Sequence, residues 1–404
     1  MTSIRKIHVS ELQLGMFLHG FDGPWMKHPF WKSRFLLTDV SDVRAAQQCG
    51  LSECWIDISR GTGIADDRPT ATAKPLPQAL SNAAPITVPA SFEFELAKAR
   101  LICNDARRAT AAMFNEARLG NAIDPGSCLP LIEEITHSIA NNASALISLV
   151  RLKTSDDYTY MHSVAVCALM VALAKNMGMS EDGCRDAGLA GLLHDLGKAG
   201  LPLDVLNKPG KLTDAEYDVI KSHPRIGANM LRQSKLTNAA ALDVCLHHHE
   251  KIDGSGYPEG LCGDQISLLA RMGAVCDVYD AITSNRPYKH GWDPADSVSK
   301  MLSWHGHFDE KVLTAFIRTV GIYPTGSLVK MRSGKLAVVM DQNASALTKP
   351  VVKLFFSTKA GVHIPVVQLD LSRPGVNDAI VGREPREKWD PTMIDALWAG
   401  ESHS

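Results

Sequence analysis

Seven side chains of the kinds that bind divalent metals follow one another in the middle of this chain, and they limit what the chain can fold into. Imidazole and carboxylate groups are the ligands that hard to borderline divalent metals prefer. Because the seven are far apart along the sequence, we expect a helical bundle whose interior brings them together. Seven ligands can hold two metals close together, and such a pair cleaves phosphate esters. In chain order they are His162, His194, Asp195, His223, His248, His249 and Asp277.

Hydrophobic spacing predicts that most of these residues lie in helices. Apolar residues recur at helical spacing from Val164 to Ala172, directly after His162. Adjacent residues of an ideal helix point about 100° apart. In an ideal helix, His194 and Asp195 therefore cannot bind one metal in the same way. We hypothesise that Asp195 bridges the two metals while His194 binds one of them.

The segment 247–250 reads His-His-His-Glu and holds one histidine more than the site needs. The pair His248 and His249 can serve the second metal from the end of a helix. One of the three histidines is then a spectator. Spacing alone does not say which one.

A lysine and a tyrosine lie near the candidate ligands in the sequence. Lys198 follows Asp195 by three residues, which is nearly one helical turn, so both can face the same side. A cation in that position would stabilise the charge of a phosphate. Tyr257 lies in the loop Gly-Ser-Gly-Tyr-Pro, where it can stack on a base, hydrogen-bond a phosphate, or simply belong to a turn.

Two cations, Arg286 and Lys289, follow the predicted helix that contains Asp277. Basic residues at this end of a helix often do no more than interact favourably with its dipole. The functional interpretation is a phosphate clamp, in which the guanidinium group of Arg286 binds two oxygens at once.

Composition and hydrophobic patterning change along the chain, which predicts several domains within a mainly α protein. The first part alternates apolar and polar residues, as half-buried strands do. A Pro- and Ala-rich stretch follows, which is typical of a linker. After the helical region, LVKMRSGKLAVVM predicts a strand, a Ser-Gly turn and a second strand. We expect a β-rich regulatory domain at 1–64, a linker at 65–90, connecting helices at 91–149, a catalytic domain at 150–320, and a β appendage with a tail at 321–404.

Composition limits which binding partners and which cellular compartment we expect. The formal net charge of −2 over 404 residues gives no global attraction to nucleic acid polymers. The nine cysteines are scattered without a C-x-x-C pair, which favours the reducing cytoplasm. The longest apolar run, Val164 to Ala174, is about half of a membrane span, so we expect no membrane segment. A homodimer is the default expectation for the assembly, and a signalling-protein partner is the alternative.

Five motifs in order give the chain a family resemblance. The sequence resembles an HD-GYP domain, a subgroup of the HD metal-dependent phosphohydrolases, over about residues 150 to 320. The segments GMFLHGFDGPW and CWIDISRG resemble an uncharacterised domain often found before HD-GYP domains. The five motifs are HDLGK at 194–198, NKPGKLT at 207–213, HPRIG at 223–227, HHEKIDGSGYP at 248–258 and DVYDAITSNRPYK at 277–289.

The resemblance implies a helical HD-type bundle that hydrolyses the bacterial messenger cyclic di-GMP to pGpG, and sometimes on to GMP. It implies two divalent metals, iron or manganese, held by the seven residues named above, with His247 as the spectator. Lys198 would assist at the phosphate. Arg286 and Lys289 would grip the phosphates of the ligand, with Tyr257 nearby.

One departure from the family concerns a third metal. Members that bind one carry a glutamate one turn before the first histidine, where this chain has Tyr158. We therefore expect two metals, unless Asp156 or Asp157 takes the place of the glutamate. Two metals about 3.5–4 Å apart would share a bridging hydroxide that attacks phosphorus in line with the leaving 3′-oxygen.

Three other functions fit the same residues. The chain can act on a different cyclic dinucleotide such as cyclic GMP-AMP, since the motifs recognise phosphates better than bases. It can be a cyclic di-GMP receptor that binds but barely cleaves, although complete ligands argue against this. It can also be an interaction module in which the N-terminal domain carries the activity.

Overall fold

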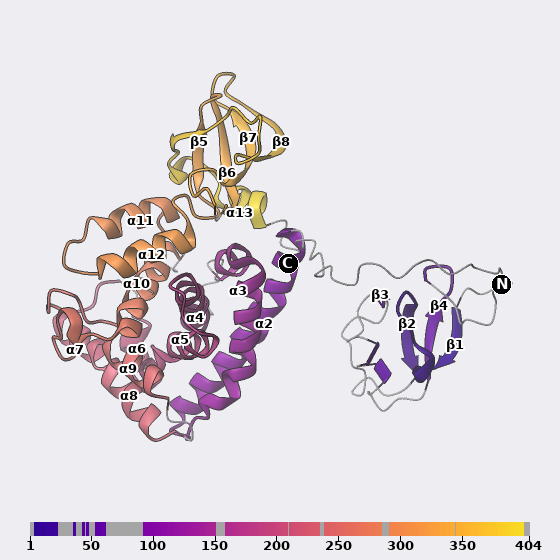
Figure 1. Ribbon diagram of the computed structural model, residues 1–404. Coiled ribbons are helices and arrows are strands. Elements are labelled where there is room, and N and C mark those ends of the chain that lie inside the picture. The colour runs from indigo at the N-terminus through magenta and orange to yellow at the C-terminus, as the bar shows by residue number, and fades with distance from the viewer. Residues whose placement is uncertain are drawn as a thin grey trace, which may run out of the picture. The chain divides into compact units, whose positions relative to one another are not determined.

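The structure, a computed structural model, divides the chain into two compact units, Met1–Ile86 and Thr87–Ser404. The linker predicted over residues 65–90 lies outside the described residues. In Figure 1 helices and a sheet form the larger unit, and a second sheet forms the smaller one. The structure describes residues 4–22, 35–37, 43–44, 46–47, 53–61, 92–150, 158–208, 210–234, 238–284, 291–343 and 345–399.

The smaller unit contains an antiparallel sheet in the order β1-β4-β2-β3. Side chains such as Leu18, Cys54 and Ile56 bury a small core of their own. The β-rich character predicted from the alternating pattern is therefore confirmed for the described residues. The strands are β1 (Ile4–His8), β2 (Phe17–Asp22), β3 (Phe35–Leu36) and β4 (Glu53–Asp57), and the 3-10 helix η1 (Val9–Glu11) follows β1.

Helices make up most of the larger unit, so the mainly α fold class is confirmed. Capping side chains start several of them, and a capping box of Thr213 and Glu216 begins α7. The helices are α2 (Phe92–Arg118), α3 (Leu129–Leu149), α4 (Tyr158–Asn176), α5 (Glu181–Leu193), α6 (Leu203–Leu206), α7 (Asp214–Lys221), α8 (His223–Arg232), α9 (Ala239–His247), α10 (Leu268–Thr283), α11 (Pro294–Leu302) and α12 (Glu310–Val320). The 3-10 helices are η4 (Pro125–Cys128), η5 (Leu196–Gly200) and η6 (Gly263–Gln265).

Helix α4 is the centre of this unit. Residues 161–174 are all buried, as expected for a helix that is apolar on every side. It packs against α2, α3, α5, α10 and α12, and Figure 1 shows it enclosed by these helices. The first turns of α4 carry His162, so the packing of this helix holds that side chain inside the bundle.

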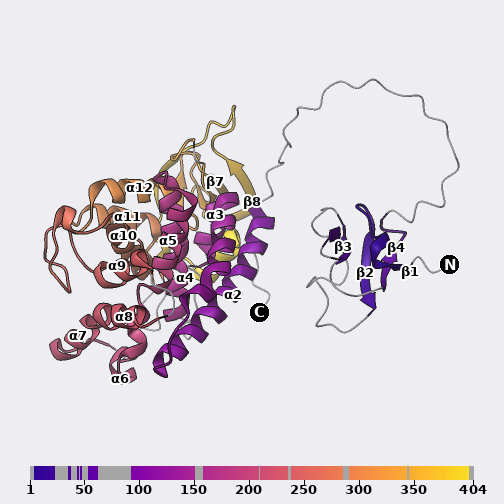
Figure 2. The same ribbon diagram turned by 60° about the horizontal axis from the view of Figure 1, so that its bottom comes forward.

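The short helices α6, α7 and α8 pack in series at one end of the larger unit, and Figure 2 shows them together there. Among the described residues, no helix has both the length and the apolar character needed to cross a membrane.

A five-stranded antiparallel sheet follows α12, in the order β8-β7-β6-β5-β9. The predicted Ser-Gly turn joins β5 to β6, with Gly334 at a φ of 78°. Helix α13 (Pro391–Ala399) covers one face of the sheet and buries Ile394 and Trp398, where we expected only a tail. The strands are β5 (Leu328–Met331), β6 (Lys335–Asp341), β7 (Val351–Ser357), β8 (Val362–Asp370) and β9 (Ile380–Arg383), and the 3-10 helix η7 (Arg386–Lys388) precedes α13.

Candidate metal centre

All seven candidate metal ligands of the sequence analysis meet inside the helical unit. They form two groups, and within each group the possible ligand atoms lie within 4.8 Å of one another. Six of the seven are buried, and His249 is partly exposed. The first group is His162, His194 and Asp277, and the second is Asp195, His223, His248 and His249.

Helix ends supply most of these side chains. His194 is the C-cap of α5, and Asp195 follows it outside helical geometry, with φ −99° and ψ 10°. His223 opens α8, and His248 is the C-cap of α9. Because the helix stops between His194 and Asp195, both side chains can turn toward the same centre.

Two glycines bring the segment of Asp195 against the helix of His223. A Cβ atom on Gly197 would lie 1.8 Å from the carbonyl oxygen of His223, and one on Gly227 would lie 2.8 Å from the backbone nitrogen of Gly197. The backbones of η5 and α8 therefore touch where no side chain could fit between them. This contact fixes the spacing between Asp195 and the imidazole of His223.

The two oxygens of Asp195 face different groups of histidines. Its Oδ2 lies 3.4 Å from His162 Nε2 and 3.3 Å from His194 Nε2. Its Oδ1 lies 3.2 Å from His223 Nε2 and 3.8 Å from His248 Nε2. A carboxylate in this position has one oxygen available for each of two ions.

Asp277 also lies between the groups. Its Oδ1 is 3.0 Å from His162 Nε2 and 3.8 Å from His194 Nε2. Its Oδ2 is 3.8 Å from His249 Nδ1. The two aspartates therefore flank the space toward which the imidazoles point.

Hydrogen bonds at the far nitrogens fix which imidazole atoms face the centre. The Nδ1 atoms of His194, His223 and His248 lie 2.8, 2.7 and 3.0 Å from the carbonyl oxygens of Gly191, Ile220 and Val244. A carbonyl only accepts, so each Nδ1 carries the proton and donates it. In the neutral ring, Nε2 then presents a lone pair to the centre. This arrangement is typical of histidines that bind metals.

Burial and neighbouring charges set ionisation states that suit a cation. Burial lowers the pKa of His248 well below its usual range and the pKa of His249 to about 3. Burial opposes ionisation of Asp195, but Lys198 and His194 hold its pKa well below the usual range. Burial also opposes protonation of His162, but the carboxylates around it raise its pKa to about 10. Neutral imidazoles beside ionised carboxylates are metal-binding forms. His248 and His249 are therefore ready to bind a cation, whereas His162 would release a proton when a metal binds.

Two buried atoms of the centre have no hydrogen bond. They are Nε2 of His194 and Oδ1 of Asp195. A buried polar atom without a partner costs free energy, and a divalent ion would satisfy both atoms. The donor set of imidazole nitrogens and carboxylate oxygens therefore fits divalent metals.

Lys198 points at the centre from η5. Its ammonium group forms an ion pair with Oδ2 of Asp195. The turn that carries it is held from behind by Arg118 of α2, whose guanidinium group donates to the carbonyl oxygens of Lys198 and Leu201, each at 3.4 Å. Lys198 is thus a cation at the edge of the proposed reaction site.

Tyr257 covers one side of the centre. Its ring stacks on that of His249, with centroids 4.7 Å apart and an interplanar angle of 25°. Burial raises the pKa of Tyr257 above its usual range, so its hydroxyl group stays protonated and can donate a hydrogen bond. Arg286, Lys289, Asp156 and Asp157 lie outside the described residues, as does the side chain of Tyr158.

Two neighbours of the ligands show roles that spacing did not reveal. His247 turns to Asp243, with Nδ1 2.8 Å from Oδ1, and it belongs to neither metal-type group. Asp280, absent from the sequence prediction, lies 2.6 Å from Nδ1 of His162. Its position three residues after Asp277, on the same side of α10, was the signal that could have found it.

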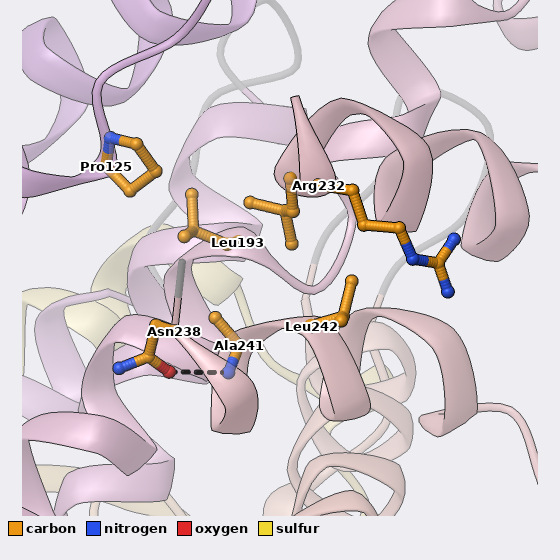
Figure 3. Close-up of a pocket in the computed structure, with 7 residues that line it drawn as sticks. Pro125, Leu193, Arg232, Asn238, Ala241 and Leu242 are labelled. Carbon is orange, nitrogen blue, oxygen red and sulfur yellow. Dashed lines mark hydrogen bonds between the residues drawn. The ribbon is translucent and has the colours of Figure 1, made fainter. Parts of the chain in front are cut away.

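A small cavity lies between the ends of α5, α8 and α9, lined by residues that include Leu193, Arg232 and Asn238 (Figure 3). Its volume of about 10 Å³ leaves space for no more than a water molecule. The side-chain oxygen of Asn238 accepts the N–H of Ala241 at 2.8 Å, which caps α9 (Figure 3). The cavity therefore belongs to the packing of the helices behind the centre.

Two family models match the chain. The model "Domain of unknown function (DUF3391)" matches residues 4–128. The model "HD domain" matches residues 135–312, which contain all seven candidate ligands. A buried histidine and aspartate cluster on an HD domain defines the protein as a hydrolase of the HD class.

A relative similar over nearly the whole length defines the family. The cyclic di-GMP phosphodiesterase PA4108 of Pseudomonas aeruginosa is 49% identical over 402 residues, which cover 99% of this chain and 97% of that protein. The chain belongs to the HD-GYP family, in the form that carries a DUF3391 domain at its N-terminus.

Other relatives share only a part of their length. The cyclic di-GMP phosphodiesterase response regulator RpfG of Xanthomonas campestris pv. campestris is 37% identical over 47% of this chain and 50% of that protein. The 3′3′-cGAMP-specific phosphodiesterase 1 of Vibrio cholerae is 39% identical over 33% of this chain and 30% of that protein.

Proposed function

We propose that the protein hydrolyses cyclic di-GMP to pGpG at a centre of two divalent metals. One observation carries the proposal: the two oxygens of Asp195 face two different groups of histidines. The relative with nearly full-length similarity, named a cyclic di-GMP phosphodiesterase, supports this substrate.

The proposed ligands divide into two sets that share Asp195. His162, His194 and Asp277 would hold one ion, and His223, His248 and His249 would hold the other. Iron and manganese both accept this mixture of imidazole and carboxylate ligands. Two such ions, when bound, supply charge that polarises a phosphate and lowers the pKa of bound water.

The residues of the chain supply the rest of the chemistry. Lys198 pairs with Asp195 and is close enough to neutralise negative charge on a phosphate in the transition state. The protonated hydroxyl group of Tyr257 would donate to a phosphate or ribose oxygen. Arg286 and Lys289 would grip the phosphates of the ligand.

The protein should be tested after anaerobic purification, with elemental analysis and cleavage assays on the same sample. We expect about two metals per chain and conversion of cyclic di-GMP to pGpG, followed by chromatography. Asp195→Ala should strip metal and abolish turnover. Asp264→Asn, which changes an exposed aspartate of the same unit, is the matched control and should keep both. Full activity with bound metal in Asp195→Ala would refute the bridging role.

The same assay separates the other candidate functions. Faster cleavage of cyclic GMP-AMP than of cyclic di-GMP would favour the activity named for the Vibrio cholerae relative. Tight binding of cyclic di-GMP without any product would favour a receptor. Whether the reaction continues to GMP is measured from the same chromatograms.

We also propose that the β-rich unit at residues 1–64 regulates the catalytic domain at 150–320. The separate core of its sheet supports independent folding. Comparing turnover of the full chain with that of residues 91–404 tests the regulatory role, since equal rates would contradict it.

We further propose that the protein works in a reducing compartment such as the cytoplasm. The described cysteines are all free thiols, which supports such a compartment.

A further inference from the structure

Glu250 lies directly after His249, and its carboxylate holds a loop rather than a metal. Its oxygens accept three consecutive backbone N–H groups, from Glu259 at 2.7 Å, Gly260 at 3.1 Å and Leu261 at 3.1 Å. The residue is only 2% exposed. Among the described residues it belongs to neither metal-type group. A carboxylate that accepts several amide donors forms strong, charge-assisted hydrogen bonds.

The loop that Glu250 holds carries Tyr257. It leaves the centre at Glu250 and returns at Leu261, so the carboxylate joins its two ends. Between them, a Cβ atom on Gly256 would lie 2.5 Å from Cα of Glu250 and 2.4 Å from the backbone nitrogen of Lys251. The tip of the loop is therefore folded tightly back onto the segment that begins it.

Tyr257 is fastened to His249 on the same loop. Its backbone N–H donates to the carbonyl oxygen of His249 at 3.2 Å, and the two rings stack. The side chain can only stay there while the returning part of the loop remains in place. Glu250 is a buried group that holds this returning part, beside the backbone bridge between Asp253 and Cys262.

A second contact closes the loop from outside. Arg225 of α8 donates to the carbonyl oxygen of Pro258 at 3.2 Å and pairs with Glu259 at 3.0 Å. Its side chain is exposed, so this pair contributes little compared with a buried carboxylate. Arg225 nevertheless connects the loop to the helix that starts at His223.

We propose that Glu250 is a positioning residue for the reaction, which fixes the loop so that Tyr257 stays stacked on His249 and presents its hydroxyl group to the substrate. The proposal rests on the proposed function, because it assigns Tyr257 to the substrate. It predicts that Glu250 acts on turnover through Tyr257 and leaves the metals in place.

The test is a double-mutant cycle with Glu250→Ala and Tyr257→Ala. Glu250→Ala should lower kcat/KM for cyclic di-GMP by about 10²-fold, as small misplacements of active-site groups do. Its metal content should equal that of the wild type. In the Tyr257→Ala background the same change should cost less than about threefold, because residues that act as a unit are not additive. Multiplicative losses, or loss of metal, would overturn the proposal.

Two further variants guard against a simple folding defect. Glu250→Gln keeps the size of the side chain and one accepting oxygen, so it should fold and show an intermediate loss. Ser180→Ala is the matched control, since it removes an acceptor from the Gly183 N–H at the start of α5, away from the loop. Ser180→Ala should lower the stability of the protein without changing kcat/KM for cyclic di-GMP. A Ser180→Ala protein with the same kinetic defect would overturn the specific role of Glu250.

Hydrogen exchange separates this proposal from the proposed function. The amides of Glu259, Gly260 and Leu261 should exchange slowly in the wild type and rapidly in Glu250→Ala, without any substrate present. A wild type that cleaves no cyclic dinucleotide would refute the proposed function. Unchanged exchange of these three amides in Glu250→Ala would refute the loop-holding role, whatever the activity.

Discussion

The Nδ1 atom of His162 lies 2.6 Å from Oδ2 of Asp280, and Asp280 is completely buried. The contact links α4 to α10 and leaves Nε2 of His162 pointing toward Asp195 and Asp277. A carboxylate behind a histidine fixes the orientation of the ring and makes the other nitrogen a stronger metal ligand. Asp280 therefore supports the metal centre without belonging to it.

Replacing Asp280 should weaken metal binding while leaving the ligands themselves intact. Asp280→Ala should lower the affinity for divalent metal by about 10–100-fold, the usual cost of losing such a partner. Titration of the metal-free protein in competition with a chelator measures the effect. The natural control is Asp243→Ala, because Asp243 makes the same kind of contact with His247. Equal metal affinities for the two variants would contradict the role of Asp280.

The three adjacent histidines should respond differently to substitution. His247 turns toward Asp243, whereas Nε2 of His248 lies 3.3 Å from Nε2 of His223 inside the centre. His247→Ala should therefore keep wild-type metal content and turnover. His248→Ala should lose one metal and most of its activity. Elemental analysis and product chromatography measure both, and metal loss in His247→Ala would refute this assignment.

The fold class could be predicted because periodicity is a local property. Alternating residues in the first part and the Ser-Gly turn between β5 and β6 directly predict strands. Helix α13 was missed although Met393, Ile394, Leu397 and Trp398 recur at helical spacing. Nine residues are too few for an isolated helix to be stable, and the burial of Ile394 and Trp398 against the C-terminal sheet stabilises this one.

The candidate site could be predicted as a set, but its internal arrangement could not. Adjacent residues point about 100° apart only in a continuous helix, and here the helix ends between His194 and Asp195. Nothing in the spacing distinguished His247 from its neighbours, since its direction depends on Asp243 beside it on α9. Asp280 and Glu250 escaped notice because they contact ligands and backbone rather than forming a ligand pattern.

Acid should weaken α7 in a predictable pH range. Hydrogen bonds from Lys208 and from the backbone of Thr213 lower the pKa of Glu216 from 4.5 to about 2. Folding thus favours the ionised form, so its stabilising effect is fully present above about pH 4.5 and disappears as the pH falls to about 2. Glu216→Gln should lower the Tm at pH 7, and its difference from the wild type should shrink through that range. A constant difference would contradict the assignment.

Replacing Lys198 should lower turnover without removing metal. Its ammonium group pairs with Asp195 at the edge of the centre, where it can neutralise charge that develops on a phosphate. Lys198→Ala should lower kcat by about 10²–10³-fold, the range found for losing one such electrostatic group. Metal content should stay the same or rise, because a positive charge next to the ions is removed. Lys221→Ala, which changes a partly exposed lysine paired with Asp218 on α7, should leave kcat unchanged. Loss of metal together with activity in Lys198→Ala would mean that the lysine holds the centre together instead of stabilising the reaction.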